Sequence, residues 1–342
     1  MDRDQLRATV LGFGGAIAVL SVLLYFVGVD ELVAELSRAD SSTVLLVVGV
    51  TLAWLLAWAI ALKTVLGVLG VSVSLPRSFL VFNGAMFSNN VTPFGQAGGE
   101  PVAALLISKM ADTEYEKGLA AIASVDTLNF VPSVSLALIG AAYFATETTF
   151  GTRLQLATGA VVLLAVAVPG AVYVGWKYRY SLENRVVSGL TPLIRWITDR
   201  IPGVPVPTPA SLESRIGHFF GAIERVATDR RAIAVSLAAS TLGWGLQMSG
   251  LWLAFVAIGE SIPFSAVLFV VPMGAMAGIT PLPGGTGGIE AVLVAVLAAL
   301  PGVTIGVETA LAAVVIYRGA VYWVPVLVGG TVVSVVGADS FG

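Results

Sequence analysis

Long apolar stretches alternate with short polar segments along most of the chain. A helix needs about 20 apolar residues to cross the hydrocarbon core of a membrane. We predict six transmembrane helices, over residues 8–29, 43–62, 118–145, 154–176, 232–259 and 309–335. The first resembles a signal peptide, but it exceeds a typical apolar core and lacks a small-residue cleavage site, so we interpret it as a retained span.

Two further apolar regions, 78–108 and 262–300, are interrupted near the middle by proline, glycine and polar residues. Each half is short for a full crossing. Irregular backbone at membrane depth is tolerated where it is buried in protein or lines a wet cavity. We therefore predict two re-entrant hairpins, each a broken helix that enters and leaves on the same side. Two full but broken spans per region are the alternative.

The composition indicates an all-α integral membrane protein, with residues 1–342 as a single membrane domain. Hydrophobic residues make up 57% of the chain and charged residues 11%, whereas soluble domains carry roughly 25% charged residues. The mean hydropathy is +0.92. These values exclude a soluble enzyme and a nucleic-acid-binding protein. The chain has no cysteine and one histidine, His218, so we expect no metal and no cofactor.

The distribution of positive charge predicts the orientation. With the N-terminus inside, fifteen of the 18 lysines and arginines fall in inner segments, two in outer segments, and Arg318 within a span. Cytoplasmic loops of membrane proteins carry an excess of Lys and Arg. We therefore predict a multi-pass protein of the cell membrane with both termini cytoplasmic.

Residues 177–231 form the longest predicted cytoplasmic loop. Apolar residues recur at helical spacing over 186–201 and 212–226, and a proline-rich linker, 202–209, separates the two stretches. Two amphipathic helices on the inner membrane face would explain the pattern, and so would a helical pair packed beneath the bundle. We place His218 in this region without a catalytic role.

The two interrupted regions resemble each other. Both read Gly-Ala-Met, then Thr-Pro, then Gly-Gly and a glutamate, the first over residues 84–100 and the second over 274–290. The first hairpin would enter from inside and the second from outside. Residues 43–145 and 232–335 are therefore predicted inverted repeats, an architecture of transporters in which broken helices meet near the midplane.

Polar residues at membrane depth form the candidate substrate-binding site. An ionised side chain at the bilayer centre costs about 2.5–3.5 kcal/mol on insertion scales, so these residues should face the interior and have partners. Asp126 and Arg318 occupy equivalent places in the two repeats, and we expect them to approach each other or share a cavity; a structural ion pair is the alternative. We assign no catalytic residue. The candidates are Asn89, Asn90, Thr92, Gly98, Gly99, Glu100, Asp126, Thr280, Gly284, Gly285, Gly287, Gly288, Glu290, Tyr317 and Arg318.

The half-helix that follows each Gly-Gly pair predicts an anion site. Its free N–H groups and positive dipole end favour phosphate, glycine-rich backbone adds donors, and Arg318 would add a bidentate contact. Glu100 and Glu290 lie at the same helix ends and would repel phosphate. They cap those ends, pair with arginine, or protonate when buried and couple substrate movement to protons. The sequence leaves these three alternatives open.

At these motifs the chain resembles the lysylphosphatidylglycerol synthase transmembrane-region family of flippase-like membrane proteins. The resemblance covers roughly residues 8–335 and rests on residues 92–101, 280–290 and Tyr317-Arg318. It implies an integral membrane protein that handles lipids. In full-length synthases this region is associated with moving the aminoacylated lipid between leaflets, and a separate soluble domain makes that lipid. These 342 residues contain no such domain, so we expect no lipid aminoacylation.

The function predicted from these features is a lipid flippase. It would move an anionic or polyprenyl-phosphate-linked lipid between leaflets, alone or as a homo-oligomer, and we expect no nucleic-acid partner. No Gly-x-x-x-x-Gly-Lys-Ser/Thr sequence is present, so this chain does not hydrolyse ATP through such a loop. We do not expect an enzyme. The alternatives are an intramembrane transferase or phosphatase on lipid-linked substrates, with Glu100 or Glu290 as base, and a small-ion or solute transporter.

Overall fold

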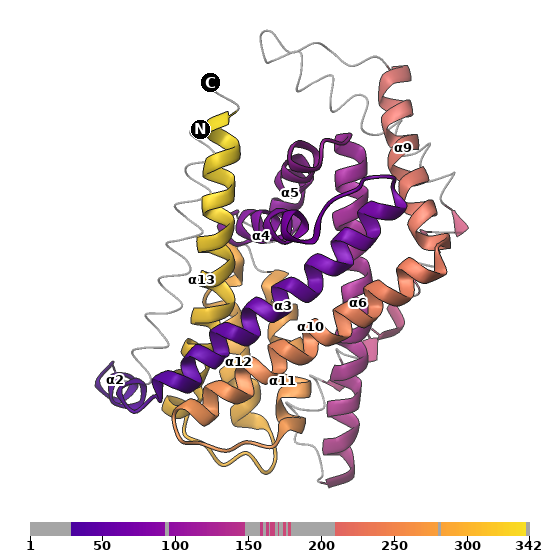
Figure 1. Ribbon diagram of the computed structural model, residues 1–342. Coiled ribbons are helices and arrows are strands. Elements are labelled where there is room, and N and C mark those ends of the chain that lie inside the picture. The colour runs from indigo at the N-terminus through magenta and orange to yellow at the C-terminus, as the bar shows by residue number, and fades with distance from the viewer. Residues whose placement is uncertain are drawn as a thin grey trace.

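The computed structural model describes residues 29–92, 96–147, 209–279 and 282–339, with scattered helical residues between 158 and 178. Within these residues the regular structure is helical (Figure 1). The expected span at 8–29 lies almost wholly outside the described residues, as do most of the expected span at 154–176 and most of the 177–231 loop before residue 209.

Three described helices are long and apolar enough to cross a membrane. They coincide with the expected spans at 43–62, 118–145 and 309–335. The apolar stretches are therefore helices of membrane-spanning length, as the sequence predicted. These helices are α3 (Ser41–Val68), α6 (Tyr115–Glu147, apolar over Tyr115–Tyr143) and α13 (Val307–Asp339, apolar over Val307–Val335).

A fourth long helix, α10 (Arg230–Ala257), falls on the expected span at 232–259. Like α3 it has 28 residues, but its Ser, Thr, Gln and Gly residues leave it outside the set of three apolar helices. It runs antiparallel to α3, and the two lie side by side (Figure 1). The Asp40 N–H donates to Ala257 O (2.7 Å), and Trp58 Nε1 donates to Ser240 O (3.5 Å).

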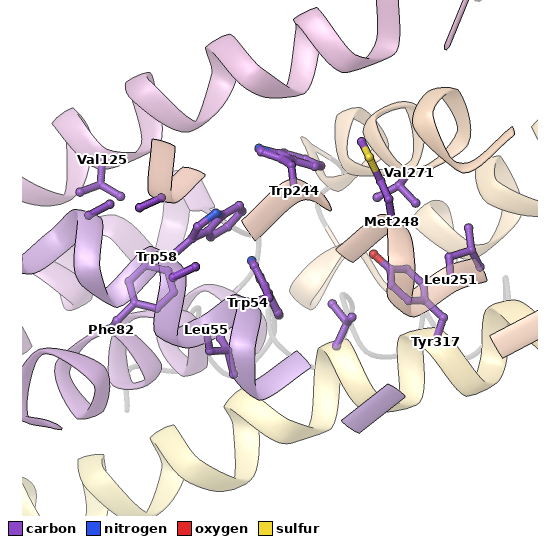
Figure 2. Close-up of a cluster of buried hydrophobic side chains, with 14 of the residues drawn as sticks. Trp54, Leu55, Trp58, Phe82, Val125, Trp244, Met248, Leu251, Val271 and Tyr317 are labelled. Atoms are coloured by element: carbon purple, nitrogen blue, oxygen red, sulfur yellow. The ribbon is translucent and has the colours of Figure 1, made fainter. Parts of the chain in front are cut away.

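An aromatic cluster fills the contact of α3 and α10 with the neighbouring helix α4 (Leu75–Val91), as Figure 2 shows. The ring of Trp58 lies 5.3 Å from Trp54, 5.8 Å from Trp244 and 6.1 Å from Phe82, each edge to face. Such pairs add about 0.5–1.5 kcal/mol each beyond their buried area. Gly243 makes the close approach possible, because a Cβ there would overlap the Trp58 indole. The cluster thus holds together the helices beside the first interrupted region.

Each interrupted region forms two short helices packed on each other. No single helix among them reaches the 20 or so residues that a crossing needs. The two pairs lie in opposite halves of the molecule: α4 and α5 in the half where α13 ends, α11 and α12 in the other (Figure 1). The first pair is α4 (Leu75–Val91) and α5 (Gln96–Ala111); the second is α11 (Phe264–Met276) and α12 (Gly288–Ala299), joined through the short 3-10 turns η1 (Ala277–Ile279) and η2 (Pro283–Gly285).

Local sequence explains both breaks. Thr92 is extended, with φ −92° and ψ 137°, because a residue before proline disfavours the helical region. In the second region Gly284, Gly285 and Gly287 have φ of +58°, +66° and +83°. Residues with a Cβ rarely adopt such angles. Pro93 and the glycines at 284, 285 and 287 therefore determine where the two breaks lie.

The remaining described helices are α2 (Val29–Ser37) and α9 (Pro209–Thr228). The α9 helix packs against α6. Its Ala222 and Val226 are buried, and Arg215 Nη1 lies 3.3 Å from Glu116 Oε1. His218 is exposed on this helix. This part of the 177–231 loop therefore packs on the bundle.

The start of α3 is fixed by Asp40. Its carboxylate accepts hydrogen bonds from the Ser42 and Thr43 hydroxyls and from the Thr43 N–H (2.9 Å). These hydrogen bonds lower the pKa of Asp40 from 3.8 to about 2, and the bond from the Ser42 hydroxyl has the largest effect. Asp40 is thus the N-cap of α3.

We expect Asp40→Ala to lower the thermal midpoint of the detergent-solubilised protein by a few degrees at pH 7. Because the folded-state pKa lies below the unfolded value, the stabilisation is present above about pH 4 and is lost as the pH falls towards 2. Asp40→Asn, which retains a capping oxygen, is the control. A loss for Asp40→Ala as large at pH 2.5 as at pH 7 would contradict this account.

Candidate functional site

The two breaks contact each other. Asn90, in the last turn of α4, lies beside Gly284 in η2: a Cβ on Gly284 would come within 3.1 Å of Asn90 Oδ1. Tyr322 of α13 joins the contact, since its hydroxyl donates to Asn90 O at 3.4 Å. Segments almost 200 residues apart in the chain therefore lie against each other, with α13 beside both.

A buried ion pair lies next to this contact. Arg318 Nε donates to Glu290 Oε1 at 2.8 Å, and Nη2 donates to Gly284 O at 3.1 Å. Glu290 Oε2 in turn accepts the Gly287 N–H at 2.6 Å. The Arg318 and Glu290 side chains are only 10% and 9% exposed. Glu290 therefore caps the start of α12 and balances the arginine charge at once.

Arg318 keeps hydrogen-bonding capacity beyond this pair. A guanidinium has five N–H donors, and the bonds to Glu290 and Gly284 use two of them. The Tyr322 ring lies 5.9 Å from the guanidinium carbon. The neighbouring Tyr317 lies elsewhere, in the apolar core against α10 (Figure 2), where its hydroxyl donates to Gln247 Oε1 at 3.3 Å.

The first break has a different charge arrangement. Asn89 packs directly on Gly99, where a Cβ would come within 2.6 Å of the Asn89 Cα, so α4 and α5 meet here. The next residue, Glu100, lies close enough to Asp126 of α6 for their charges to interact. Asp126 Oδ2 is buried and has no hydrogen-bond partner among the described residues. Two acidic groups therefore interact at the first break.

Asp126 and Arg318 have different neighbours, although the repeat places them at equivalent positions. The described ion pair of Arg318 is with Glu290, and none of the described ion pairs involves Asp126. The charge of Glu100 acts on Asp126. The alternative interpretation, a structural ion pair between Asp126 and Arg318, is therefore absent among the described ion pairs. Each charge instead pairs or interacts with the glutamate of its own region.

The other predicted site residues line the two breaks. Thr92 ends α4, and its N–H donates to Ser88 O at 3.1 Å. Gly98 lies in the first turn of α5, Gly285 in η2, and Gly288 begins α12. Thr280 lies outside the described residues.

Two residues that the sequence analysis did not single out belong to this region. Tyr322 bridges the breaks, as described above. Asn129 follows Asp126 by three residues in α6, so both lie on one helix face. Its side chain is 6% exposed, and both its amide atoms lack a partner among the described residues. An amide at this spacing from a buried acid, in an otherwise apolar helix, was the available signal.

Comparison with known proteins covers nearly the whole chain. The family model of the lysylphosphatidylglycerol synthase TM region matches residues 9–329. A UPF0104 membrane protein of Methanothermobacter thermautotrophicus is 27% identical, over 86% of this chain and 85% of its own. Another of Pyrococcus horikoshii is 27% identical, over 93% of this chain and 94% of its own. With the helices and both breaks inside the matched region, this membrane protein belongs to the lysylphosphatidylglycerol synthase transmembrane-region family.

Proposed function

We propose that this protein moves an anionic, phosphate-bearing lipid or lipid-linked headgroup between the leaflets of the cell membrane. One observation carries the proposal: the two breaks contact each other at Asn90 and Gly284, beside the buried Arg318. Transporters built from repeats bind their substrates where broken helices meet. A contact between two such breaks next to an arginine supports an anionic substrate.

The topology follows from the same proposal. The α4–α5 and α11–α12 pairs are re-entrant hairpins, the first entering from the cytoplasm and the second from outside. Their places in opposite halves of the molecule support this topology (Figure 1). Antiparallel α3 and α10 would then be the first spans of two inverted repeats, 43–145 and 232–335. With the spans at 8–29 and 154–176, both termini are cytoplasmic.

Arg318 is the proposed ligand of the substrate phosphate. Glu290 holds the place that the phosphate would take, since a carboxylate and a phosphate both accept from a guanidinium and from an N–H at a helix start. Substrate entry would replace Glu290 at Arg318. Glu290 would leave the start of α12 when the phosphate arrives. Its charge would then no longer repel the headgroup at that helix end.

A transport assay tests the proposal. Purified protein in liposomes is expected to speed the exchange of fluorescent phosphatidylglycerol between leaflets, read by dithionite quenching, over protein-free liposomes. Arg318→Lys keeps the charge but loses the bidentate contact, and a charged hydrogen bond of about 1.5–3 kcal/mol corresponds to a rate loss of roughly tenfold or more. Arg38→Lys, at an exposed arginine, is the matched control.

Two outcomes count against the proposal. One is exchange no faster than in empty liposomes for phosphatidylglycerol and for a polyprenyl phosphate. The other is an Arg318→Lys variant that is folded and as active as the Arg38→Lys control.

The intramembrane transferase or phosphatase is a second candidate because the charges of Glu100 and Asp126 interact, as those of an acid–base pair would. Mass spectrometry of the lipids after the same incubation separates the two functions. An enzyme changes the lipid, whereas a flippase returns it unchanged.

A further inference from the structure

The acidic group at the first break has no described positive partner. At the second break, Arg318 balances Glu290. At the first, Glu100 and Asp126 interact with each other, and none of the described ion pairs includes either residue. Charges at membrane depth are expensive and are normally paired. This difference between two otherwise similar regions points to a positive ligand at the first break.

Two buried asparagines, Asn89 beside Gly99 and Asn129 three residues after Asp126, have amide atoms without described partners. Asn89 and Asn129 are 5% and 6% exposed. Asn89 Oδ1, both amide atoms of Asn129 and Asp126 Oδ2 are buried without a hydrogen-bond partner in the described part of the chain. Native proteins rarely leave such atoms unpaired. The oxygens among these atoms therefore have the capacity to bind a group that the described residues do not supply.

The residues that bear these atoms belong to three helices, and α5 packs on both α4 and α6. Asn89 comes from the last turn of α4 and packs on Gly99, the neighbour of Glu100 in α5. Asp126 and Asn129 project from one face of α6. The end of α4 also contributes, because the negative end of a helix dipole lies at its last turn. In membrane transporters, the C-terminal ends of half-helices and unwound backbone carbonyls coordinate Na⁺ or protons.

We propose that Asn89, Glu100, Asp126 and Asn129 form a binding site for a monovalent metal cation, Na⁺. The donor set offers carboxylate and amide oxygens, which suit a hard cation, and no thiol or imidazole. Among the described residues, no three His, Cys, Asp or Glu side chains lie close enough together to hold a metal ion by themselves. A Ca²⁺ site commonly draws on more carboxylates than the two found here.

The site also suggests what the ion does. Bound Na⁺ would tie α4 and α5 to α6. Asn89 is followed directly by Asn90, which contacts Gly284 of the second break, and Gly284 O accepts from Arg318. Occupancy of the ion site would therefore bias the contact between the breaks. This coupling role rests on the proposed flippase function, whereas Na⁺ binding does not.

The test measures binding without transport. The full chain in detergent is titrated with NaCl, with choline chloride holding ionic strength constant, while thermal unfolding and ²²Na⁺ binding are followed. We expect a saturable rise in thermal midpoint with Na⁺. Glu100→Gln and Asp126→Asn should each weaken Na⁺ affinity tenfold or more. Glu260→Gln, at an exposed acidic residue, should leave it unchanged.

Several results would overturn the proposal. The first is a rise in thermal midpoint that is equally large with choline or K⁺. The second is a rise with Ca²⁺ but none with Na⁺, or a thermal midpoint that responds to pH alone. The third is an unaltered Na⁺ affinity in a folded Glu100→Gln variant. Because Glu100 is only half-buried, we expect Glu100→Gln to fold. This variant therefore tests the site even if Asp126→Asn does not fold. A protein that binds Na⁺ but moves no lipid would refute the proposed function and leave the cation site standing.

Discussion

Replacing Arg318 with leucine is expected to lower the free energy of unfolding by about 3–5 kcal/mol, because it leaves a buried carboxylate without its counter-charge. Arg318 and Glu290 are both buried, and their 2.8 Å hydrogen bond lies next to the contact between the breaks. The variant also loses the bond to Gly284 O. Chemical denaturation of the detergent-solubilised protein, followed by circular dichroism, measures the loss.

A double-mutant cycle measures the interaction energy between Arg318 and Glu290 separately from the contribution of each residue alone. Glu290→Gln alone is expected to be strongly destabilising, since Arg318 is then unpaired, although a glutamine oxygen can still accept the Gly287 N–H. Glu290→Gln with Arg318→Leu should be more stable than the sum of the two losses predicts, because no buried charge remains. The surface pair of the exposed Arg38 with Glu35 is the control, and Arg38→Leu should cost less than about 1 kcal/mol. Strictly additive losses at Glu290 and Arg318 would show that the two charges do not depend on each other.

The positions of the breaks could be predicted because their causes are local. Proline restricts the residue before it, so α4 ends at Val91 and Thr92 is extended. The glycines at 284–287 allow backbone angles that other residues avoid. The three apolar helices could also be predicted from the sequence. A helix in lipid requires a continuous apolar stretch, whichever helices it contacts.

The interaction partners of the charged residues could not be predicted from the sequence. The predicted repeat makes Asp126 and Arg318 equivalent positions, but equivalence does not say which positions touch. Arg318 reaches Glu290, 28 residues earlier, because α12 and α13 pack together. Asp126 instead lies near Glu100. These neighbours depend on how helices pack, which a pattern along one helix does not contain.

The polar character of α10 has a similar explanation. Its glycine and serine residues lower its hydropathy but allow close packing, as small residues do between membrane helices. Gly243 admits the Trp58 ring, and Ser240 O accepts from the Trp58 indole. The sequence predicted a helix here. Its composition reflects a helix partner rather than lipid on that face, and the partner, α3, became visible only in the fold.

Packing of α13 on α4 gives the second large expected effect. A Cβ on Gly329 would overlap the backbone oxygen of Asn83 and approach Phe87 Cβ to 2.7 Å. A backbone oxygen in the middle of a helix cannot rotate aside, so α4 and α13 must separate. We expect Gly329→Ala to lower the free energy of unfolding by about 3 kcal/mol, the upper end of overpacking losses.

Gly319 in the same helix is a matched control, since a Cβ there would meet nothing within 4 Å. Gly319→Ala should be neutral or stabilising by up to about 1 kcal/mol, because alanine favours the helix. The α4 helix carries Asn90 to the second break, so its displacement in Gly329→Ala should also slow lipid exchange, even at temperatures where the variant is folded. Equal thermal midpoints and equal exchange rates for the two alanine variants would show that α13 does not hold α4, and with it the first break, in place.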